Sequence, residues 1–298
     1  MRSTHSLAVV DTAFQPGAIS TQRQAANDDQ LVEIWLHGRS VHTQRAYAAD
    51  AERFRVFFGK PLPTVTLADL QSFSDSLGKL APATRARILS SVKSLIGFGH
   101  RLGYLPFDVG SALRLPTQKN TLAERIISES DVHRMVDREP NPRNRAILRL
   151  LYAAGVRVSE LTGLCWRDLQ ARGDGGQITA YGKGGKTRAV LLPAGIWCDL
   201  VGLRGDAPIE SPVFISRKGG ALDPSQVWRI VRAASKRAGI DAPVSPHFMR
   251  HAHASHALDR GAPIHLVMAT LGHASVATTG RYLHVRPTES SARYLMEL

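Results

Sequence analysis

Residues 245–251 read Ser-Pro-His-Phe-Met-Arg-His. Serine is favoured just before a helix and proline at its first position, so the stretch predicts a helix that begins at Pro246. His247 and Arg250 are three residues apart and would share one face of the first turn. A helix N-terminus offers free N–H groups and positive potential to an anion. The stretch therefore predicts a phosphate site, although a capped surface helix with incidental polar residues would have the same pattern.

Histidines are frequent around this stretch, and His247 and His251 have the i, i+4 spacing that can bind zinc. No acidic or cysteine ligand stands close to them in the sequence, and Arg250 would bring a fixed positive charge against the metal. We therefore expect neither a metal nor a cofactor.

Residues 182–187 read Gly-Lys-Gly-Gly-Lys-Thr and lie between two short β-type runs, 178–181 and 189–192. The Gly-Lys-Thr ending suggests an ATP-binding P-loop, but alanine stands where that motif needs its first glycine, and no helix pattern follows. A β-hairpin is predicted instead. Its tip would carry Lys183 and Lys186, either as a solvated turn or as a contact to a DNA backbone.

Arg157 lies between Val156 and Val158 at a break between two helical patterns. A charged side chain with apolar neighbours is expected to be half buried, and it then needs an anion. That anion is Glu160, a ligand phosphate, or both, with Glu160 fixing the guanidinium.

Tyr282 follows His273 by nine residues near the C-terminal end. A lone tyrosine is usually a core or interface residue, and the chain has six tyrosines. Its position after the other motifs is what makes Tyr282 a candidate nucleophile.

Four strings in this order resemble the tyrosine recombinase (phage integrase) family, including its Xer-type members. They are Gly-Val-Arg-Val-Ser-Glu-Leu at 155–161, Gly-Lys-Gly-Gly-Lys-Thr-Arg at 182–188, Pro-His-x-x-Arg-His at 246–251, and Leu-Gly-His-x-Ser-x-x-Thr-Thr-x-x-Tyr at 271–282. The resemblance is strong over residues 125–290 and weaker before them. Met249 stands where leucine is usual in the family, and this departure alters none of the groups expected to be catalytic.

The resemblance implies a metal- and ATP-independent reaction on DNA. Tyr282 would attack a phosphodiester, form a 3′-phosphotyrosyl link and release a 5′-hydroxyl. Arg157 and Arg250 would hold the two non-bridging oxygens. Lys183 would protonate the leaving oxygen.

The remaining roles also follow from the resemblance. His247 would accept the tyrosine proton or bond a phosphate oxygen, His273 would donate to the phosphate, and Glu160 would support the arginines. Further DNA contacts are expected at Arg45, Lys93, Lys186 and Arg188.

The chain pattern predicts two folded units. Residues 1–26 are polar and aperiodic and are expected to form a flexible arm, residues 27–112 are helical, residues 113–124 form a polar linker, and residues 125–298 mix helices with the hairpin. The expected class is mainly α with a small antiparallel β-sheet. By resemblance, the first unit is a SAM-like core-binding domain and the second an α+β catalytic domain that breaks and rejoins DNA. The segment after Tyr282 would dock on a neighbouring protomer.

Apolar spacing sets the expected helices. In the first unit they start at Asp28 and cover residues 40–58, 67–80 and 84–102. In the second they cover residues 144–154, 159–164, 227–238, 246–260 and 264–271.

The composition agrees with a polyanionic partner. The 298 residues include 38 Lys and Arg against 25 Asp and Glu, a formal charge of +13. Residues 1–118 hold 13 basic and 9 acidic side chains, and the rest hold 25 and 16, so both units would face the polyanion. Two cysteines exclude a disulfide scaffold, and the longest apolar run, at 189–198, is too short to cross a membrane.

We therefore expect a cytoplasmic, nucleoid-associated protein. Its partner would be double-stranded DNA with inverted-repeat core sites, bound by a dimer, with a tetramer exchanging strands through a Holliday junction. A paralogous recombinase or an accessory protein is a further candidate partner. A type IB topoisomerase and a DNA-binding protein without catalysis are the alternative interpretations.

Overall fold

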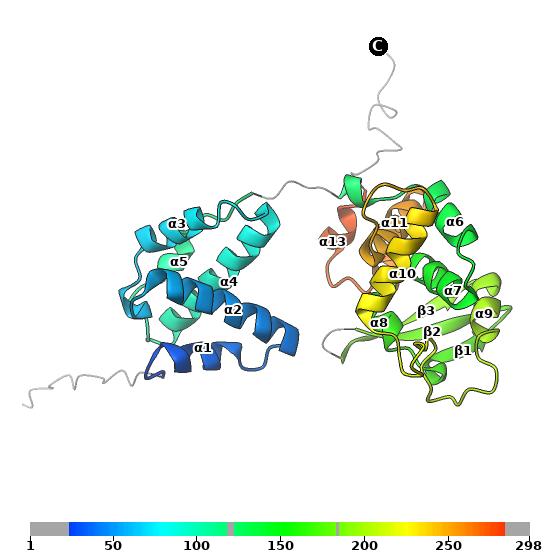
Figure 1. The fold of residues 1–298 in the computed structure, drawn as a ribbon, viewed down its shortest axis with the longest axis horizontal. Coiled ribbons are helices and arrows are strands. Elements are labelled where there is room, and N and C mark those ends of the chain that lie inside the picture. Colours follow the sequence, from blue (N-terminus) through cyan, green and yellow to red (C-terminus); the bar gives the residue numbers. More distant parts are fainter. Residues whose placement is uncertain (1–23, 118–121, 183–184, 284–298) are drawn as a thin grey trace, which may run out of the picture. The chain divides into compact units, whose positions relative to one another are not determined.

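The computed structural model describes residues 24–117, 122–182 and 185–283. Contacts divide the chain into two compact units, Met1–Lys119 and Asn120–Leu298, and each has its own apolar core (Figure 1). The expected class, mainly helical with one small antiparallel sheet, is confirmed.

The first unit is all-helical where the structure describes it. Its elements are α1 (Asp28–Leu36), α2 (Val41–Phe58), the 3₁₀ turn η1 (Leu62–Thr64), α3 (Leu67–Ser76), α4 (Pro82–Arg101) and α5 (Val109–Ala112). The long helix α4 contacts α1, α2 and α5. Its side chains Leu89 and Leu95 are completely buried. Phe54 of α2 packs edge-on against Phe73 of α3, with ring centroids 5.0 Å apart.

Local signals place the ends of these helices. The Ser40 side chain accepts a hydrogen bond from the Thr43 N–H and starts α2, which Gly59 ends in the left-handed region. Thr66 and Asp69 form a capping box at the start of α3. The predicted end of this helix at residue 80 was wrong. Helix α3 ends at Ser76, because residues 77–81 form the turn that leads to Pro82, the first residue of α4.

The second unit combines helices with a three-stranded sheet. Its helices are η2 (Ala123–Arg125), α6 (Glu129–Asp137), α7 (Pro142–Ala153), α8 (Val158–Thr162), η3 (Trp166–Asp168), α9 (Ala194–Val201), α10 (Pro224–Arg237), α11 (Pro246–Asp259), α12 (Ile264–Leu271) and α13 (Val276–Gly280). Its strands are β1 (Leu169–Arg172), β2 (Gly175–Tyr181) and β3 (Thr187–Leu192), in that order across the sheet.

The predicted hairpin is confirmed as the antiparallel pair β2–β3, which runs from Tyr181 opposite Thr187 to Gly176 opposite Leu192. The strand that follows the Gly-Lys-Thr motif is incompatible with a P-loop, which needs a helix there. Residues 183–184 at the hairpin tip lie outside the described residues.

Strand β1 and helices α6 and α9 are among the elements of this unit that were not predicted. Strand β1 was missed because only one of its four residues, Leu169, is a large apolar residue. Helix α6 has a clear signal, since the Ser128 side chain caps it and Val132 and Met135 are buried on one face. Helix α9 continues the apolar run of β3, and Pro193 at its N-cap marks the change from strand to helix.

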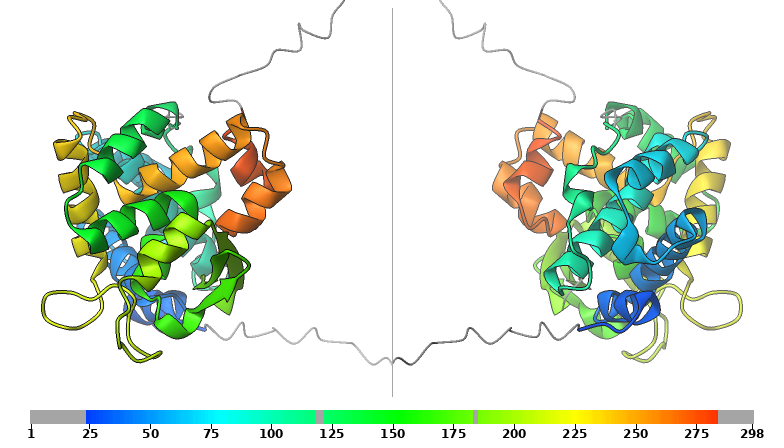
Figure 2. Two further views of the ribbon diagram at one scale, coloured as in Figure 1. Left: turned by 90° about the vertical axis from the view of Figure 1, so that its right-hand side faces the viewer. Right: turned by 90° about the vertical axis from the view of Figure 1, so that its left-hand side faces the viewer.

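Contacts between helices and strands of the second unit bring together the elements that carry the candidate site residues. Helix α11 lies beside α7, α12 contacts α11 and β3, and α8 contacts β2 (Figure 2, left). The main apolar core of this unit includes the fully buried side chains Ile147, Leu151 and Ile178. Every helix in the described part of the chain is too short or too polar to span a bilayer.

Candidate active site

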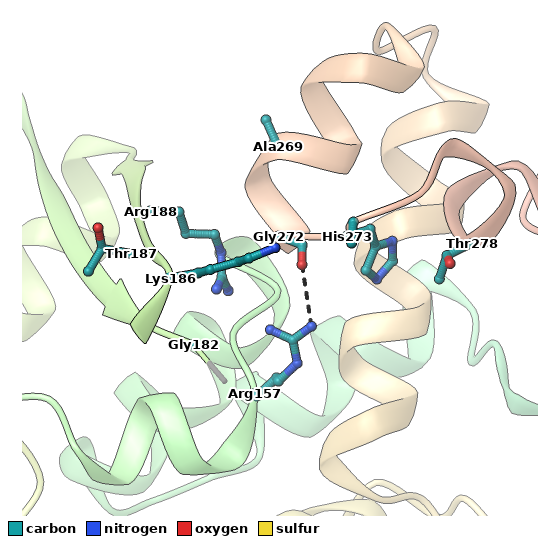
Figure 3. A pocket seen from close by; sticks show the side chains of 10 residues that line it. Arg157, Gly182, Lys186, Thr187, Arg188, Ala269, Gly272, His273 and Thr278 are labelled. Carbon is teal, nitrogen blue, oxygen red and sulfur yellow. Dashed lines mark hydrogen bonds between the residues drawn. The ribbon is translucent and has the colours of Figure 1, made fainter. Parts of the chain in front are cut away.

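Arg157 occupies the N-cap of α8, where the chain leaves α7 through Gly155. Its backbone N–H donates to Oε2 of Glu160 at 2.7 Å, and Nη1 donates to Oε1 of the same carboxylate at 2.8 Å. Its side chain is 37% exposed, so part of the guanidinium faces solvent. Nη2 also reaches the carbonyl of Gly272 at 3.5 Å (Figure 3).

Glu160 joins this arginine to a second one. Arg188 of β3 donates from Nη1 and Nη2 to the two carboxylate oxygens, each at 2.7 Å. Burial raises the pKa of Glu160, but the hydrogen bonds from Arg188 and Arg157 outweigh it and bring the pKa to about 2. The carboxylate is therefore ionised and holds both guanidinium groups.

Arg188, which was expected to contact DNA, lines the cavity described below and is largely buried. Its side chain is 11% exposed, and Nε donates to the carbonyl of Thr270 at 2.6 Å. The guanidinium thus links β3 to Glu160 and to the end of α12.

Arg250 is buried in the first turns of α11. Its Nη1 donates to the carbonyl of Gly155 and its Nη2 to the carbonyl of Leu271 at 2.5 Å. Burial and the charges of Arg157 and Arg188 lower its pKa to about 10, so it stays cationic at neutral pH. Ser245 does take the N-cap position, but its side chain makes no capping hydrogen bond.

Two glycines allow this close packing. Gly155 has φ +55°, and a Cβ there would stand 2.6 Å from a methyl group of Leu271. Gly272 ends α12 in the left-handed region, and a Cβ there would stand 3.1 Å from the Arg188 side chain. A side chain at residue 155 would therefore collide with Leu271, whose carbonyl holds Arg250, and a side chain at residue 272 would crowd Arg188 directly.

His273 follows directly and is half buried. Its Nδ1 lies 2.8 Å from Oγ1 of Thr279. Burial and the charges of Arg250, Arg157 and Arg188 lower its pKa to about 4, so the imidazole is neutral at pH 7.

A cavity of about 640 Å³ opens between these elements (Figure 3). Its lining includes Arg157, Lys186, Arg188 and His273. The exposed Lys186 side chain extends toward Gly272 across the cavity. Among the described residues that line the cavity there is no carboxylate, and Glu160 lies behind Arg157 and Arg188, so this concentration of donors suits a ligand of negative charge.

His247 lies in the first turn of α11 and lines a neighbouring cavity of about 690 Å³, together with Val158 and Trp228. Loss of hydration and the charges of Arg250 and Arg157 lower its pKa. His247 is therefore close enough to Arg250 and Arg157 to feel their positive charge, although it lines a different cavity.

Tyr282 follows α13 and is 6% exposed. Its ring packs in an apolar cluster with Leu122, Ile126, Ala254, Val267 and Leu271. Burial raises the pKa of its phenol. The hydroxyl lies 2.7 Å from Nδ1 of His251, a residue whose role the sequence did not indicate.

The remaining expected residues are spread over the chain. Lys183 lies outside the described residues. Arg45 is exposed on α2. Lys93 on α4 donates to the carbonyls of Ser111 at 3.4 Å and Leu113 at 2.6 Å, so it ties down the chain after α5. Within the described ranges, no group of three or more His, Cys, Asp or Glu side chains could hold a metal ion.

Comparisons with known proteins identify the family of the chain. The family model of the phage integrase family matches residues 124–289, and that of the phage integrase N-terminal SAM-like domain matches residues 33–101. Tyrosine recombinase XerD of Mycobacterium tuberculosis is 34% identical over 219 residues, which cover 68% of this chain and 70% of the relative. Tyrosine recombinase XerC of Pelobacter propionicus is 30% identical over 266 residues, which cover 83% and 85%.

Solved structures share the fold. The XerH recombinase bound to its difH substrate before cleavage has a TM-score of 0.70 at 20% identity, with 90% of this chain and 84% of that chain covered. A lambda integrase tetramer bound to a Holliday junction has a TM-score of 0.68 at 16% identity, with 84% and 78% covered. The motifs, the two matched domains and the relatives point the same way, and the chain belongs to the phage integrase family of tyrosine recombinases.

Proposed function

We propose that this protein is a site-specific DNA recombinase that cuts and rejoins duplex DNA through Tyr282. The observation that carries the proposal is that Arg157 and His273 line one open cavity. The buried Arg250 is held at the neighbouring carbonyls of Gly155 and Leu271, and Tyr282 comes two residues after the next helix. The carboxylate of Glu160 accepts hydrogen bonds from Arg157 and Arg188 and so holds both guanidinium groups in position.

The cavity would hold the scissile phosphate. Arg157, which is partly exposed, and the buried Arg250 would bond its two non-bridging oxygens. Two fixed guanidinium groups supply the positive charge that the crowded pentacoordinate phosphorus needs, and they are already in place before DNA arrives. Neutral His273 and His247 would donate hydrogen bonds to phosphate oxygens without adding charge.

The reaction would be a transfer between two esters. A bond forms from the Tyr282 oxygen to phosphorus as the bond to the 5′-oxygen breaks. Lys183 would protonate that oxygen. The phosphotyrosyl link keeps the energy of the phosphodiester, so rejoining needs no ATP.

Access to Tyr282 has to change during this cycle, because its side chain is 6% exposed. We propose that binding of DNA and of a neighbouring protomer uncovers it. The segment from residue 285 to 298, which lies outside the described residues, would dock on that neighbour. Deletion of residues 287–298 should then reduce tetramer assembly and cleavage, and a deletion that left both intact would contradict this step.

The partners follow from likeness to the relatives. One related structure is a lambda integrase dimer bound to a core site, and another is a tetramer on a Holliday junction. We propose that residues 27–112 and 125–298 both bind duplex DNA, joined by the linker at 113–124 and preceded by the arm at 1–26. A dimer would bind inverted-repeat core sites, and a tetramer would exchange strands. The protein would act in the cytoplasm on nucleoid DNA, alone or with a paralogous recombinase or accessory protein.

A nicked suicide substrate tests the proposal. The Tyr282→Phe variant first selects a binding site from a pool of random duplex DNA, because it can bind without cutting. Wild type should then become covalently attached to a nicked copy of that site, in EDTA as well as in buffer. Tyr282→Phe should form no adduct, whereas Tyr181→Phe, which removes an exposed hydroxyl bonded to Asp168, should still form it. Absence of any adduct with wild type would overturn the proposal.

A further inference from the structure

The hydroxyl of Tyr282 has a dedicated partner. His251 comes directly after Arg250 on α11, and its Nδ1 lies 2.7 Å from the phenolic oxygen. The two rings are 5.7 Å apart and tilted by 44°. Within the described residues, this is the one hydrogen bond that the Tyr282 hydroxyl makes.

The surroundings favour one direction for this hydrogen bond, from the phenol to the imidazole. Burial, His247 and the charges of Arg125, Arg250 and Arg281 lower the pKa of His251 to about 4, so the ring is neutral at pH 7. Burial raises the pKa of Tyr282, so the phenol keeps its proton. A phenol is a better donor than acceptor, and a neutral imidazole with its hydrogen on Nε2 offers Nδ1 as the acceptor.

This direction suits a nucleophile. With its hydrogen directed to Nδ1, the phenolic oxygen keeps its lone pairs free for phosphorus. The other histidines nearby are differently placed. His247 lines the neighbouring cavity with Val158 and Trp228, and Nδ1 of His253 is bonded to the carbonyl of Tyr152 at 2.8 Å.

We propose that His251, rather than His247, takes the proton of Tyr282 when the tyrosine attacks DNA. The inference rests on the proposed function. As the bond from Oη to phosphorus forms, the O–H bond breaks and its proton moves to Nδ1 of His251. The electron pair of the broken P–O bond leaves with the 5′-oxygen, which takes a proton from Lys183. Rejoining runs the same transfers in reverse.

The entering phosphate makes this transfer feasible. In the free protein, an imidazolium at His251 would stand among three arginines. The negative charge of a DNA phosphate bound beside Arg250 offsets that repulsion, so the histidine becomes a better proton acceptor when the substrate is present.

Single-turnover cleavage of the selected suicide substrate tests the inference. His251→Asn places an amide oxygen near the Nδ1 position, so it can accept the hydrogen bond but cannot take the proton. His251→Ala removes both. Both variants should cleave about 100-fold or more slowly than wild type, the usual size of a lost general base. His265→Ala, at an exposed position of α12, should cleave at the wild-type rate.

A more acidic nucleophile provides the second readout. Difluorotyrosine introduced at position 282 gives up its proton more easily, so the defect of both His251 variants should shrink by about tenfold or more. A misfolded site would not be repaired by this change. Asparagine keeps the hydrogen bond, so that variant carries the test if the alanine variant does not fold.

The results separate the two proposals. If wild type forms no adduct, the proposed function fails. If wild type forms one and His251→Asn cleaves at a near-wild-type rate, His251 only positions the tyrosine and the inference is overturned. The inference is also overturned if His251→Asn and His251→Ala both cleave at the wild-type rate. It is overturned as well if difluorotyrosine at position 282 leaves the cleavage defect of these two variants unchanged.

Discussion

Arg188 meets Glu160 end to end, with each terminal nitrogen 2.7 Å from one carboxylate oxygen. The same carboxylate binds Arg157 through its side chain and its backbone N–H. One buried anion thus fixes two arginines from different elements, α8 and β3. In the proposed phosphate site, these two guanidinium groups are therefore held in place by Glu160 in the free protein.

Glu160→Gln should destabilise the second unit by about 3 kcal/mol, because it leaves the largely buried guanidinium of Arg188 and the partly exposed one of Arg157 without their anion. Urea unfolding of the variant measures the loss. The matched control is Glu210→Gln, which breaks a pair with Arg167 in which both side chains are more than half exposed and which should contribute less than about 1 kcal/mol. Equal losses in the two variants would show that Glu160 is not a structural hub.

Gly155→Ala should damage both stability and cleavage. The residue has φ +55°, its carbonyl accepts from Arg250, and a Cβ would collide with Leu271 at 2.6 Å. Strain and overpacking together should cost about 3 kcal/mol. Gly173→Ala is the control, because Gly173 has φ +59° but open space around it, and should lose only about 1 kcal/mol. Single-turnover cleavage should fall in the first variant alone.

The histidines of the site should make the fold sensitive to mild acid. His251 and His273 have a pKa of about 4 in the folded chain against an ordinary 6.5. As the pH falls from 6.5 toward 4, the unfolded chain takes up these protons before the folded chain does. The stability that the two neutral histidines contribute is therefore complete above pH 6.5 and is lost progressively below it.

Thermal unfolding between pH 7.5 and 4.5 measures this loss, which should reach about 2 kcal/mol after allowance for screening. Replacing both residues by asparagine should flatten the dependence in that window. The exposed His265→Asn should leave it as in wild type. An unchanged slope in the double variant would place the acid sensitivity elsewhere.

The sequence located the arginines and offered Glu160 as a partner of Arg157, but it did not reveal their contacts with distant segments. Arg157 and Arg250 stand in motifs whose residue types suit a phosphate, and their positions follow from helix caps at residues 157 and 245. Arg188 was predicted only as a DNA contact, without an internal partner. Its partner is 28 residues away in the chain, and a one-dimensional pattern contains no information on that contact.

The same limit explains why the His251–Tyr282 pair was missed. Both residues belong to the quoted motifs, and the i, i+4 spacing of His247 and His251 was visible. Which imidazole faces the phenol depends on how α11 and the segment after α13 pack, across 31 residues. Helix α6 is a different case, because its serine cap and its apolar face are local patterns that the residue order alone displays.

Lys186 and Lys93 should separate DNA contact from folding. Lys186 is exposed at the cavity, and nothing in the described residues forms an ion pair with it, so Lys186→Ala should weaken DNA binding and lower the salt slope by about one counterion. Lys93 donates to two backbone carbonyls after α4, so Lys93→Ala should lower the unfolding temperature and leave the salt slope unchanged. Titration of labelled duplex at several salt concentrations, together with thermal unfolding, measures both effects. A lower slope in the Lys93 variant with an unchanged unfolding temperature would reverse the assignment and place α4 against the DNA backbone.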